Sequence, residues 1–339
     1  LADRYGSKRM LLVYLAGCAA TGLMAAIAPT LWILFAAMVA MGCFAAIYHP
    51  AGLSLISRVT TPETRGQALG WHGILGSIGI AAAPLTAGVL FGTGVTGWRG
   101  YYAALVVPAV LIAIMLARLV PDDRPGRNND TGSDSAFESE FAMRWKSYLV
   151  LVTTGALSGI VYAGFLHFLP RYLDETGLRP AGMESSSFRN YLAAMVLLFG
   201  VAGQAIAGRL ARPGRLEPML TLILAGSVPC LCWMAVADGS SRLAATCTLA
   251  VVHFMSQPVY NSLVAQYVPA SRRSTGYGFS NMLTFGIGAL GPLYAGFAGD
   301  QALVYGGLAV VVGVAAVLAG GLWIGRDSVP DPATETRAG

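Results

Sequence analysis

Long apolar runs separated by short polar loops fill this sequence almost from end to end. A helix needs roughly 20 mostly apolar residues to cross the hydrocarbon core of a bilayer, with its backbone groups bonded internally. The composition agrees, because only 12% of the residues are charged, against about 25% in an ordinary soluble domain. An outer-membrane barrel is excluded, since its strands alternate apolar and polar residues, whereas these runs are continuous. The sequence therefore predicts an all-α membrane protein.

Ten apolar runs are bounded by charges or turn residues, and they predict ten transmembrane helices. The runs lie at residues 10–28, 31–56, 67–92, 99–119, 147–169, 190–210, 218–237, 242–267, 275–298 and 302–325. Pro50 falls within the second run and is expected to kink or loosen it, because proline donates no backbone hydrogen bond.

Two polar segments divide the chain into predicted domains. Residues 120–146 are rich in Asp, Ser, Gly and Asn, as expected for a flexible cytoplasmic linker. The tail at 326–339 has no apolar face and is predicted to be disordered. Residues 1–119 then form an incomplete N-terminal bundle of four helices, and residues 147–325 form a C-terminal bundle of six.

Basic residues are distributed unevenly between the two sides that alternate loops define. Of the 22 Lys and Arg residues, 17 fall on one side: Arg4, Lys8, Arg9, Arg58, Arg65, Arg118, Arg124, Arg127, Arg144, Lys146, Arg209, Arg212, Arg215, Arg272, Arg273, Arg326 and Arg337. The other side has Arg99, Arg171, Arg179, Arg189 and Arg242. The positive-inside rule makes the first side cytoplasmic. We therefore expect a multi-pass protein of the inner (plasma) membrane with both ends of this chain in the cytoplasm.

The sequence has no arrangement typical of an enzyme or a cofactor site. It contains no nucleophile–base pair, metal-ligand cluster or Gly-rich phosphate loop, and its cysteines lie in apolar runs without zinc or disulfide spacing. The basic residues are scattered along the loops rather than clustered, which argues against nucleic-acid binding. We expect no enzymatic activity, cofactor, metal ion or nucleic-acid partner.

The two halves of the sequence repeat each other at an offset of 208 residues. The offset pairs Arg4 with Arg212, Gly6 with Gly214, Pro50 with Pro258, Ser54 with Ser262, Arg65 with Arg273, Gly70 with Gly278, Pro84 with Pro292 and Gly88 with Gly296. The paired loops have the same topology, which indicates a parallel repeat about an axis along the membrane normal, as in many transporters. The four prolines, with Gly88 and Gly296, are the predicted sites of helix kinking and close packing.

The repeat also predicts two helices before Leu1. The second half has helices at 147–169 and 190–210 before its basic loop, whereas the first half begins within that loop. About 60 preceding residues, roughly two spans and a connection, are therefore expected. A first residue other than Met fits this expectation.

The opening segment LADRYGSKR, residues 1–9, resembles the cytoplasmic loop between the second and third helices of major facilitator superfamily transporters. A degenerate copy, GRLARPGR, occurs at residues 208–215, with Ala211 in the place of the Asp. The resemblance covers essentially the whole chain and implies the major facilitator fold of two pseudo-symmetric six-helix bundles, here without the first two helices. It also implies that Asp3 and Arg4 help to lock the cytoplasmic side between conformations.

Further segments are similar to parts of drug:proton exporters in that superfamily. GCFAAIYHPAG at 42–52 resembles the fourth helix of the fosmidomycin-resistance type. IAAAPLTAG at 80–88 and ALGPLYAG at 289–296 are similar to the antiporter motif of the fifth helix, although Ala83 replaces its Gly in the first copy. Met38 stands about where many such exporters carry a membrane Arg. The resemblance implies export but leaves the usual proton-coupling route without its Arg.

Polar residues inside the apolar runs are candidates for a transport pathway, because such groups face a cavity or a partner. His49 pairs with Gln257 in the repeat and could load a proton within the physiological pH range. It could equally bond a backbone carbonyl that Pro50 leaves open. The acidic residues lie in loops, helix ends and tails, so a carboxylate proton carrier would belong to the missing first helix. The predicted pathway set is Tyr48, His49, Gln204, Gln257, Tyr260, Asn261 and Asn281.

The remaining histidines are expected to be structural. His72 lies near a predicted helix start and is expected at the membrane interface. His167 and His253 are expected to be packed with their hydrogen bonds satisfied.

These features predict a secondary transporter that works by alternating access. The predicted cytoplasmic gate consists of Asp3, Arg4, Arg65, Arg212 and Arg273, which would stabilise the outward-open state through charge-assisted bonds. The expected substrate is a small organic drug or metabolite exported in exchange for protons, and the expected state is a monomer in the lipid bilayer. Proton-coupled metabolite uptake and a non-transporting membrane scaffold or sensor remain as alternatives.

Overall fold

The computed structural model describes residues 2–92, 97–120 and 144–326, and every regular element in those ranges is a helix. The elements are α1 (Ala2–Tyr5), α2 (Ser7–Ala26), α3 (Leu31–Ala45), α4 (Tyr48–Val59), α5 (Pro62–Gly92), α6 (Trp98–Leu119), α8 (Trp145–Asp174), α9 (Ser185–Leu210), α10 (Leu216–Val236), α11 (Ser241–Phe254), α12 (Ser256–Tyr267), the 3-10 turn η1 (Ala270–Arg272), α13 (Arg273–Gly288), α14 (Leu290–Ala298) and α15 (Gln301–Arg326). The predicted all-α fold is confirmed. Most of the predicted linker and nearly all of the predicted tail lie outside the described residues.

Three pairs of consecutive helices meet at a break a few residues before a proline. The run predicted at 31–56 divides into α3 and α4 just after Ala46, which lies four residues before Pro50. Breaks in the same relation to Pro258 and Pro292 separate α11 from α12 and α13 from α14. A proline ring clashes with the carbonyl four residues earlier and removes its hydrogen bond. The break therefore lies upstream of each proline rather than at it.

Eight segments of the described chain are long and apolar enough to cross a membrane. They are Ser7–Ala26, Leu31–Val59, Pro62–Leu90, Trp98–Leu119, Trp145–Asp174, Ser187–Leu210, Leu216–Val236 and Gln301–Gly325. The shorter pieces α11 to α14 are not among them, so the number of ten spanning helices stays a prediction.

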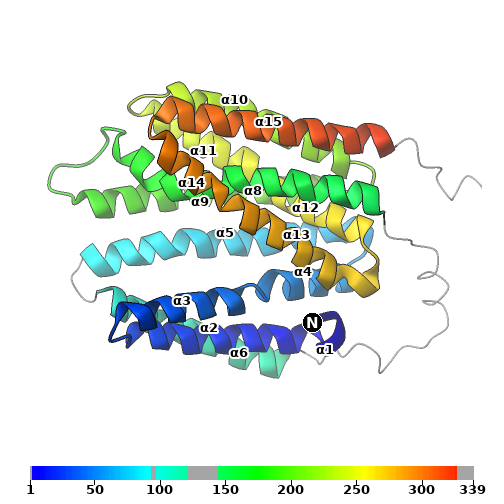
Figure 1. Ribbon diagram of the computed structural model, residues 1–339, viewed down its shortest axis with the longest axis horizontal. Coiled ribbons are helices and arrows are strands. Elements are labelled where there is room, and N and C mark those ends of the chain that lie inside the picture. Colours follow the sequence, from blue (N-terminus) through cyan, green and yellow to red (C-terminus); the bar gives the residue numbers. More distant parts are fainter. Residues whose placement is uncertain (1, 93–96, 121–143, 327–339) are drawn as a thin grey trace, which may run out of the picture.

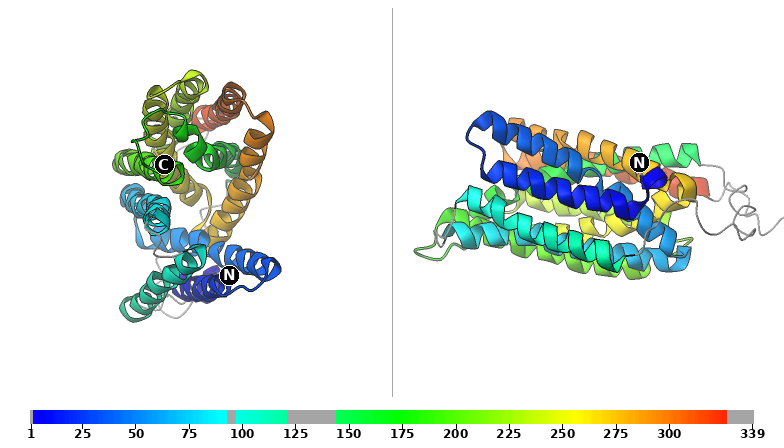
Figure 2. Two further views of the ribbon diagram at one scale, coloured as in Figure 1. Left: turned by 90° about the vertical axis from the view of Figure 1, so that its left-hand side faces the viewer. Right: turned by 90° about the horizontal axis from the view of Figure 1, so that it is seen from below.

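The helices are arranged in two groups, which we call the first half (residues 2–120) and the second half (residues 144–326). In Figure 1, α2, α3 and α6 lie along one edge, α4 and α5 follow, and α8 to α15 make up the rest; Figure 2 shows the same separation from the end. The buried apolar core belongs mainly to the second half, with Leu53, Leu69 and Ala81 of α4 and α5 joining it. Thus α4 and α5 connect the first half to the second.

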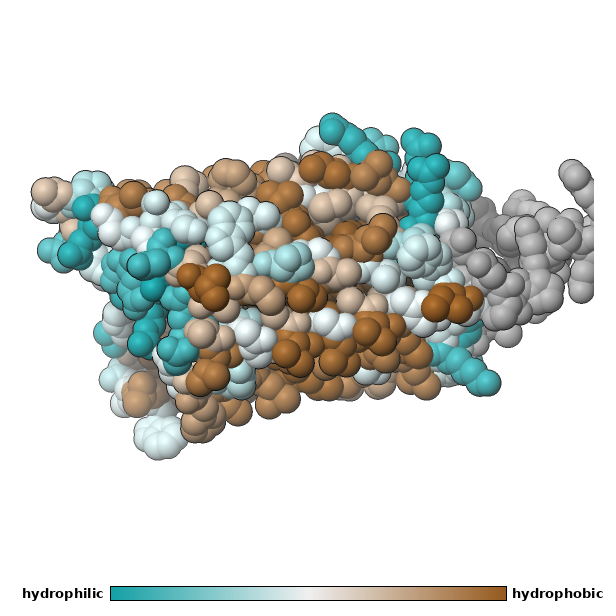
Figure 3. Space-filling view, turned by 90° about the horizontal axis from the view of Figure 1, so that it is seen from above, coloured by the Kyte–Doolittle hydropathy of each residue, from teal (hydrophilic) through white to brown (hydrophobic). Residues whose placement is uncertain are grey.

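Apolar side chains cover the middle of the molecular surface seen in Figure 3, and hydrophilic ones are gathered towards its two ends. The α6 helix has no buried residue, and its Val107, Leu111 and Met115 are each more than half exposed. A helix whose apolar side chains face outward in this way is suited to contact with lipid.

The two ends of the helix bundle carry different groups. We call the end where α4 stops and α5 and α13 begin the basic end, because Arg58, Arg65 and Arg273 lie there. The opposite end, where α2 turns into α3 and α14 into α15, is the far end. In the predicted topology the basic end is cytoplasmic.

Candidate functional site

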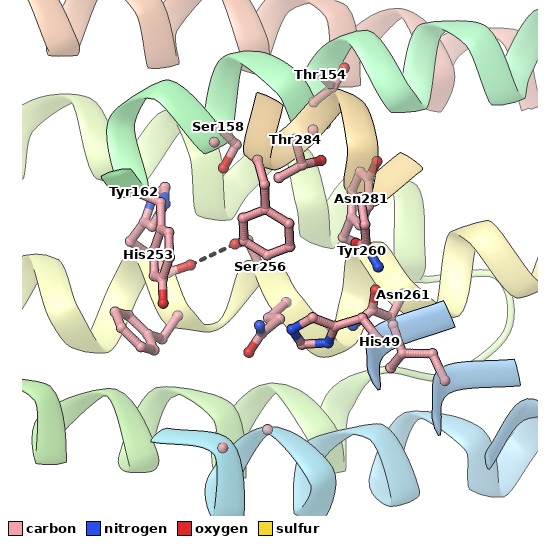
Figure 4. A pocket seen from close by; sticks show the side chains of 18 of the residues that line it. His49, Thr154, Ser158, Tyr162, His253, Ser256, Tyr260, Asn261, Asn281 and Thr284 are labelled. Atoms are coloured by element: carbon pink, nitrogen blue, oxygen red, sulfur yellow. Dashed lines mark hydrogen bonds between the residues drawn. The ribbon is translucent and has the colours of Figure 1, made fainter. Parts of the chain in front are cut away.

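A cavity of about 400 Å³ lies between the two halves, within the size range of pockets that hold small organic ligands. Figure 4 shows side chains of both halves around the same space. The first half contributes Tyr48, His49 and His72, and the second half contributes Tyr260 and Asn281 among others. None of the described residues that line the cavity is Asp, Glu, Lys or Arg.

Helix breaks bring polar side chains to this cavity. The first turns of α4, which begins at Tyr48, and of α12, which begins at Ser256, both line it. Interrupted backbone at membrane depth is tolerated where it lines a cavity, and transporters bind substrates at such discontinuous helices. The structure brings together these members of the predicted pathway: Tyr48, His49, Gln257, Tyr260, Asn261 and Asn281.

His49 and His72 both lie in the cavity wall and stack on aromatic rings. The ring centroids of His49 and Phe285 are 5.7 Å apart with an interplanar angle of 24°, so this contact joins α4 to α13 of the other half. The rings of His72 and Tyr48 are stacked at 5.6 Å. The expectation of an interfacial His72 is not met, because α5 begins at Pro62 rather than at 67 and carries His72 deeper into the bundle.

His253 is also part of the cavity wall, whereas His167 is not. The imidazole of His253 is stacked on Tyr162 with an interplanar angle of 17°, and its Nδ1 is buried with no hydrogen-bond partner in the ranges that the structure describes. In contrast, Nδ1 of the exposed His167 lies 2.9 Å from the Ala163 carbonyl oxygen in its own helix. The expected packing with satisfied hydrogen bonds is thus met by neither residue, because His167 is bonded but exposed and His253 is buried with an unbonded Nδ1.

Gln204 lies behind the cavity wall rather than in it. Its side chain is 1% exposed, and its Nε2 donates to Oε1 of Gln257 at 2.7 Å and to the Ser77 hydroxyl at 3.0 Å. Ser77 belongs to the first half, so Gln204 connects the two halves through a polar bond. Gly73 makes room for it, because a Cβ there would collide with the Gln204 amide. The residue supports a lining residue and does not itself line the cavity.

Tyr260 and Asn281 differ in how their polar atoms are satisfied. The Tyr260 hydroxyl shares a 2.6 Å hydrogen bond with the Ser280 hydroxyl and lies against Gly155, where a Cβ would collide with it. The Nδ2 of Asn281 is buried and has no partner in the described part of the chain. Since buried donors are normally bonded, Asn281 is available to a ligand.

Two arginines of the predicted gate meet at the basic end. Arg273 Nη1 donates to the Ser57 carbonyl oxygen at 2.8 Å, and Arg65 Nη2 approaches the same oxygen at 3.4 Å. That carbonyl belongs to the last turn of α4, where unpaired carbonyls give the helix end a partial negative charge. The repeat mates Arg65 and Arg273 thus cap one helix end from opposite halves.

A hydroxyl pair beside these arginines also crosses between the halves. The hydroxyls of Ser57 and Tyr277 are 2.8 Å apart and both buried. Ser57 Oγ also lies 2.7 Å from the Leu53 carbonyl, and Tyr277 Oη lies 2.7 Å from the Asn261 carbonyl. Nothing in the sequence pattern singled out Ser57 or Tyr277, because their pairing depends on tertiary contact alone.

The other members of the predicted gate lie apart from this cluster. Arg4 is exposed, with its guanidinium carbon 5.5 Å from the centroid of the Tyr5 ring, and Arg212 is exposed on the loop after α9. The Asp3 side chain lies outside the described part of the structure. A gate role for these three residues therefore stays a prediction.

One buried carboxylate, that of Glu217, has no signal in the apolar pattern of the sequence. Glu217, in the first turn of α10, is 1% exposed, and its Oε1 accepts hydrogen bonds from Gln266 and Tyr267 of α12. The run predicted at 218–237 starts one residue after it, so the sequence placed Glu217 in a loop. It lies on the same side of α10 as the cavity-lining Leu220, one turn closer to the basic end.

Glycines allow helices of the site to approach closely. A Cβ on Gly208 of α9 would lie 2.8 Å from the Gly70 Cα of α5, so the two backbones touch across the halves. A Cβ on the predicted packing residue Gly88 would lie 3.0 Å from the Tyr191 ring, and one on Gly296 would lie 4.0 Å from the Phe168 ring. Close packing is therefore tighter at Gly70 than at the two glycines chosen from the repeat.

No set of three or more His, Cys, Asp or Glu residues in the described ranges is arranged to hold a metal ion. The cavity wall offers hydrogen-bonding groups and aromatic rings from both halves.

Comparison with known families gives a match over most of the chain. The sequence profile of the Major Facilitator Superfamily matches residues 1–292. The puromycin resistance protein pur8 of Streptomyces alboniger is 35% identical over 125 residues, which are 37% of this chain and 24% of the relative. The multidrug efflux pump LfrA of Mycolicibacterium smegmatis is 29% identical over 178 residues, 50% of this chain and 33% of that protein. The matched segments thus span about a quarter to a third of these relatives.

Solved structures with the same fold cover nearly the whole chain. The human organic anion transporter MFSD10 (TETRAN) superimposes with a TM-score of 0.76 at 15% identity, over 94% of this chain and 78% of that one. The transporter FucP in its outward conformation superimposes with a TM-score of 0.65 at 16% identity, over 94% and 84%. At these identities the likeness concerns the fold.

Proposed function

The chain belongs to the Major Facilitator Superfamily of membrane transporters, and from this premise we propose that it exports a small organic drug or metabolite in exchange for protons. The observation that carries the proposal is the cavity between the halves, because a site lined from both sides can be exposed to either side as the halves rock. The names of the matched relatives, a puromycin resistance protein and a multidrug efflux pump, favour export over uptake.

Proton coupling is assigned to His49. Its imidazole lies in the cavity and touches Phe285 of the other half, so its surroundings change when the halves move. An imidazole can gain and lose a proton within the physiological pH range. None of the described lining residues is a carboxylate that would compete for this role.

The gate is assigned to the basic end, which the positive-inside rule makes cytoplasmic. Arg65 and Arg273 bond the end of α4 there, and the hydroxyls of Ser57 and Tyr277 pair between the halves. Charge-assisted hydrogen bonds of this kind are stronger than neutral ones and hold the cytoplasmic side closed while substrate leaves on the other side. Asp3, Arg4 and Arg212 complete the proposed gate. The proposed working unit is a monomer in the inner membrane, with the chain ends in the cytoplasm.

The test is proton-driven transport in everted membrane vesicles with the variants His49→Gln and His167→Gln. His167 is the matched control, because it is exposed and bonds its own helix. With a panel of aromatic antibiotics, we expect His49→Gln to abolish compound-dependent proton release and His167→Gln to leave it unchanged. Unaltered proton release in His49→Gln would remove His49 as the carrier. Movement of the compounds in the opposite direction would establish uptake, and no movement of any compound would favour a scaffold or sensor.

A further inference from the structure

The side chains of the described cavity wall that can carry charge near neutral pH are all bases. Among the described lining residues these groups are His49, His72 and His253. A tyrosine ionises only near pH 10, and an imidazole is either neutral or positive. The part of the wall formed by the described residues is therefore neutral or positively charged at physiological pH.

Each of these histidines is stacked on an aromatic ring. His49 pairs with Phe285, His72 with Tyr48 and His253 with Tyr162, at interplanar angles of 24°, 30° and 17°. The face of an aromatic ring is where a cation would be attracted. One face of each of these three rings already contacts an imidazole, which itself repels a cation once it is protonated.

From this arrangement we propose that the cavity accepts aromatic compounds that are uncharged or weakly acidic and excludes organic cations. The inference rests on the proposed transport function, since it names the substrate class of the same site. A cation transferred into this cavity would lose its hydration without gaining a counter-charge from the described wall, which is costly. An uncharged aromatic ring avoids that cost, an anionic one can be paired by a protonated histidine of the wall, and either can pack among Tyr48, Tyr162 and Phe285.

Hydrogen-bonding groups of the wall define a second requirement. Asn281 Nδ2 is a buried donor without a partner among the described residues, so it fits an acceptor oxygen of the ligand. The Ser256 and Thr154 hydroxyls donate to backbone carbonyls at 2.6 and 2.9 Å, which leaves their oxygens as acceptors. A phenol, carbonyl or carboxylate oxygen on the aromatic system matches the donor of Asn281.

Three two-ring probes of similar size test the charge preference: 2-naphthol, 2-naphthoate and N-methylquinolinium. Binding is measured by calorimetry on the protein in lipid nanodiscs, with empty nanodiscs as the blank. We expect 2-naphthol and 2-naphthoate to bind at least tenfold more tightly than N-methylquinolinium. Equal or tighter binding of the cation would overturn the proposal, and so would failure of all three probes to bind.

Two variants of Asn281 test whether the probes bind in this cavity. Asn281→Ala is expected to weaken 2-naphthoate binding about tenfold, because one buried hydrogen bond is lost. Asn190→Ala, on α9 and outside the cavity lining, is the matched control and should bind as the parent does. Asn281→Asp adds a carboxylate of nearly the same shape and is expected to reverse the preference in favour of N-methylquinolinium. An unchanged preference in Asn281→Asp would contradict the assignment.

The same probes separate this inference from the transport proposal. Asn281-dependent binding of 2-naphthoate without proton-driven movement would retain the substrate class and refute transport. Proton-driven movement of N-methylquinolinium would retain transport and refute the substrate class.

Discussion

The basic end and the far end of the interface between the halves are held together in different ways. At the basic end, the backbones of α5 and α9 touch at Gly70 and Gly208, and Arg273 bonds the end of α4 from across the interface. At the far end, α5 meets α9 where Gly88 faces the ring of Tyr191. A backbone contact has no freedom to rearrange, whereas an aromatic ring can turn aside.

The charged contacts follow the same division. Arg65 and Arg273 are inserted between the halves at the basic end. At the far end, Arg242 pairs with Glu175 at 2.5 Å, and this contact joins α11 to the end of α8 within one half. We infer that the basic end is a closed gate in this conformation and that the far end is where the halves separate.

Gly76 provides a position for measuring which end is open. It lines the cavity, and a Cβ added there would meet no atom within 4 Å, so Gly76→Cys is tolerated in this conformation. The five native cysteines would first be replaced by serine. Reaction of Gly76→Cys with a membrane-impermeant maleimide, applied from either side of the membrane, then reports access from each end.

The largest effect is expected from Gly208→Leu in this labelling background. A single added carbon at Gly208 would already lie 2.8 Å from the Gly70 backbone, so a leucine side chain forces α5 and α9 apart at the basic end. The rate of labelling of Gly76→Cys from the basic side should rise to that of a fully accessible cysteine. Gly88→Leu is the far-end counterpart, and the basic side should stay closed in it because only the Tyr191 ring has to move. If Gly208→Leu labels like the parent, the basic end is not the gate.

Replacing Arg273 by Met should have the next largest effect. The charged hydrogen bond to the Ser57 carbonyl is lost, and such bonds contribute about 1.5–3 kcal/mol, which corresponds to a roughly ten- to hundredfold shift toward the open basic end. The matched control is Arg209→Met, because Arg209 is exposed in the last turn of α9 and is not part of the proposed gate. The rate of labelling from the basic side checks both variants. Equal effects of the two would indicate general charge loss instead of a specific bond.

The positions of these residues show what the sequence could predict. Proline chemistry located the break before Pro50, and the repeat carried it to Pro258, so the first turns of α4 and α12 were correctly chosen as polar lining. Helical spacing likewise brought Gln257 and Asn261 to one cavity. These features are local, and local pattern suffices to find them.

Features that depend on tertiary contact or on the position of a helix end were not predictable. The α5 helix starts earlier than its apolar run suggests, so His72 lies in the cavity wall and not at the interface. The α10 helix likewise starts before its apolar run, and Glu217 in its first turn is buried. The contact of Ser57 with Tyr277 joins residues of different halves and has no periodic signature. Helix ends and such side-chain pairs are the least constrained by hydrophobic pattern.

Tyr277→Phe should open the basic end by a smaller amount than Arg273→Met. The variant keeps the ring and removes a hydroxyl that contacts Ser57 and the Asn261 carbonyl. Ser57 keeps its bond to the Leu53 carbonyl, so no hydroxyl is left unsatisfied, and a net loss of about 0.5–1.5 kcal/mol corresponds to a roughly two- to tenfold shift. Tyr294→Phe removes an exposed hydroxyl bonded to the Leu303 carbonyl and is the matched control. No change in labelling with Tyr277→Phe would leave the gate to the arginines alone.

The smallest effect is expected from Glu175→Gln at the far end. The side chain of Glu175 is 58% exposed, and exposed ion pairs contribute about 0–1 kcal/mol. The pair with Arg242 also joins two elements of the same half, so whatever it contributes is present in both the open and the closed states. The rate of labelling of Gly76→Cys from either side should therefore change less than twofold, and the midpoint temperature of thermal unfolding in detergent should fall slightly. A large shift in labelling would mean that the far end is held by charge as the basic end is, and the difference between the two ends would no longer explain which one opens.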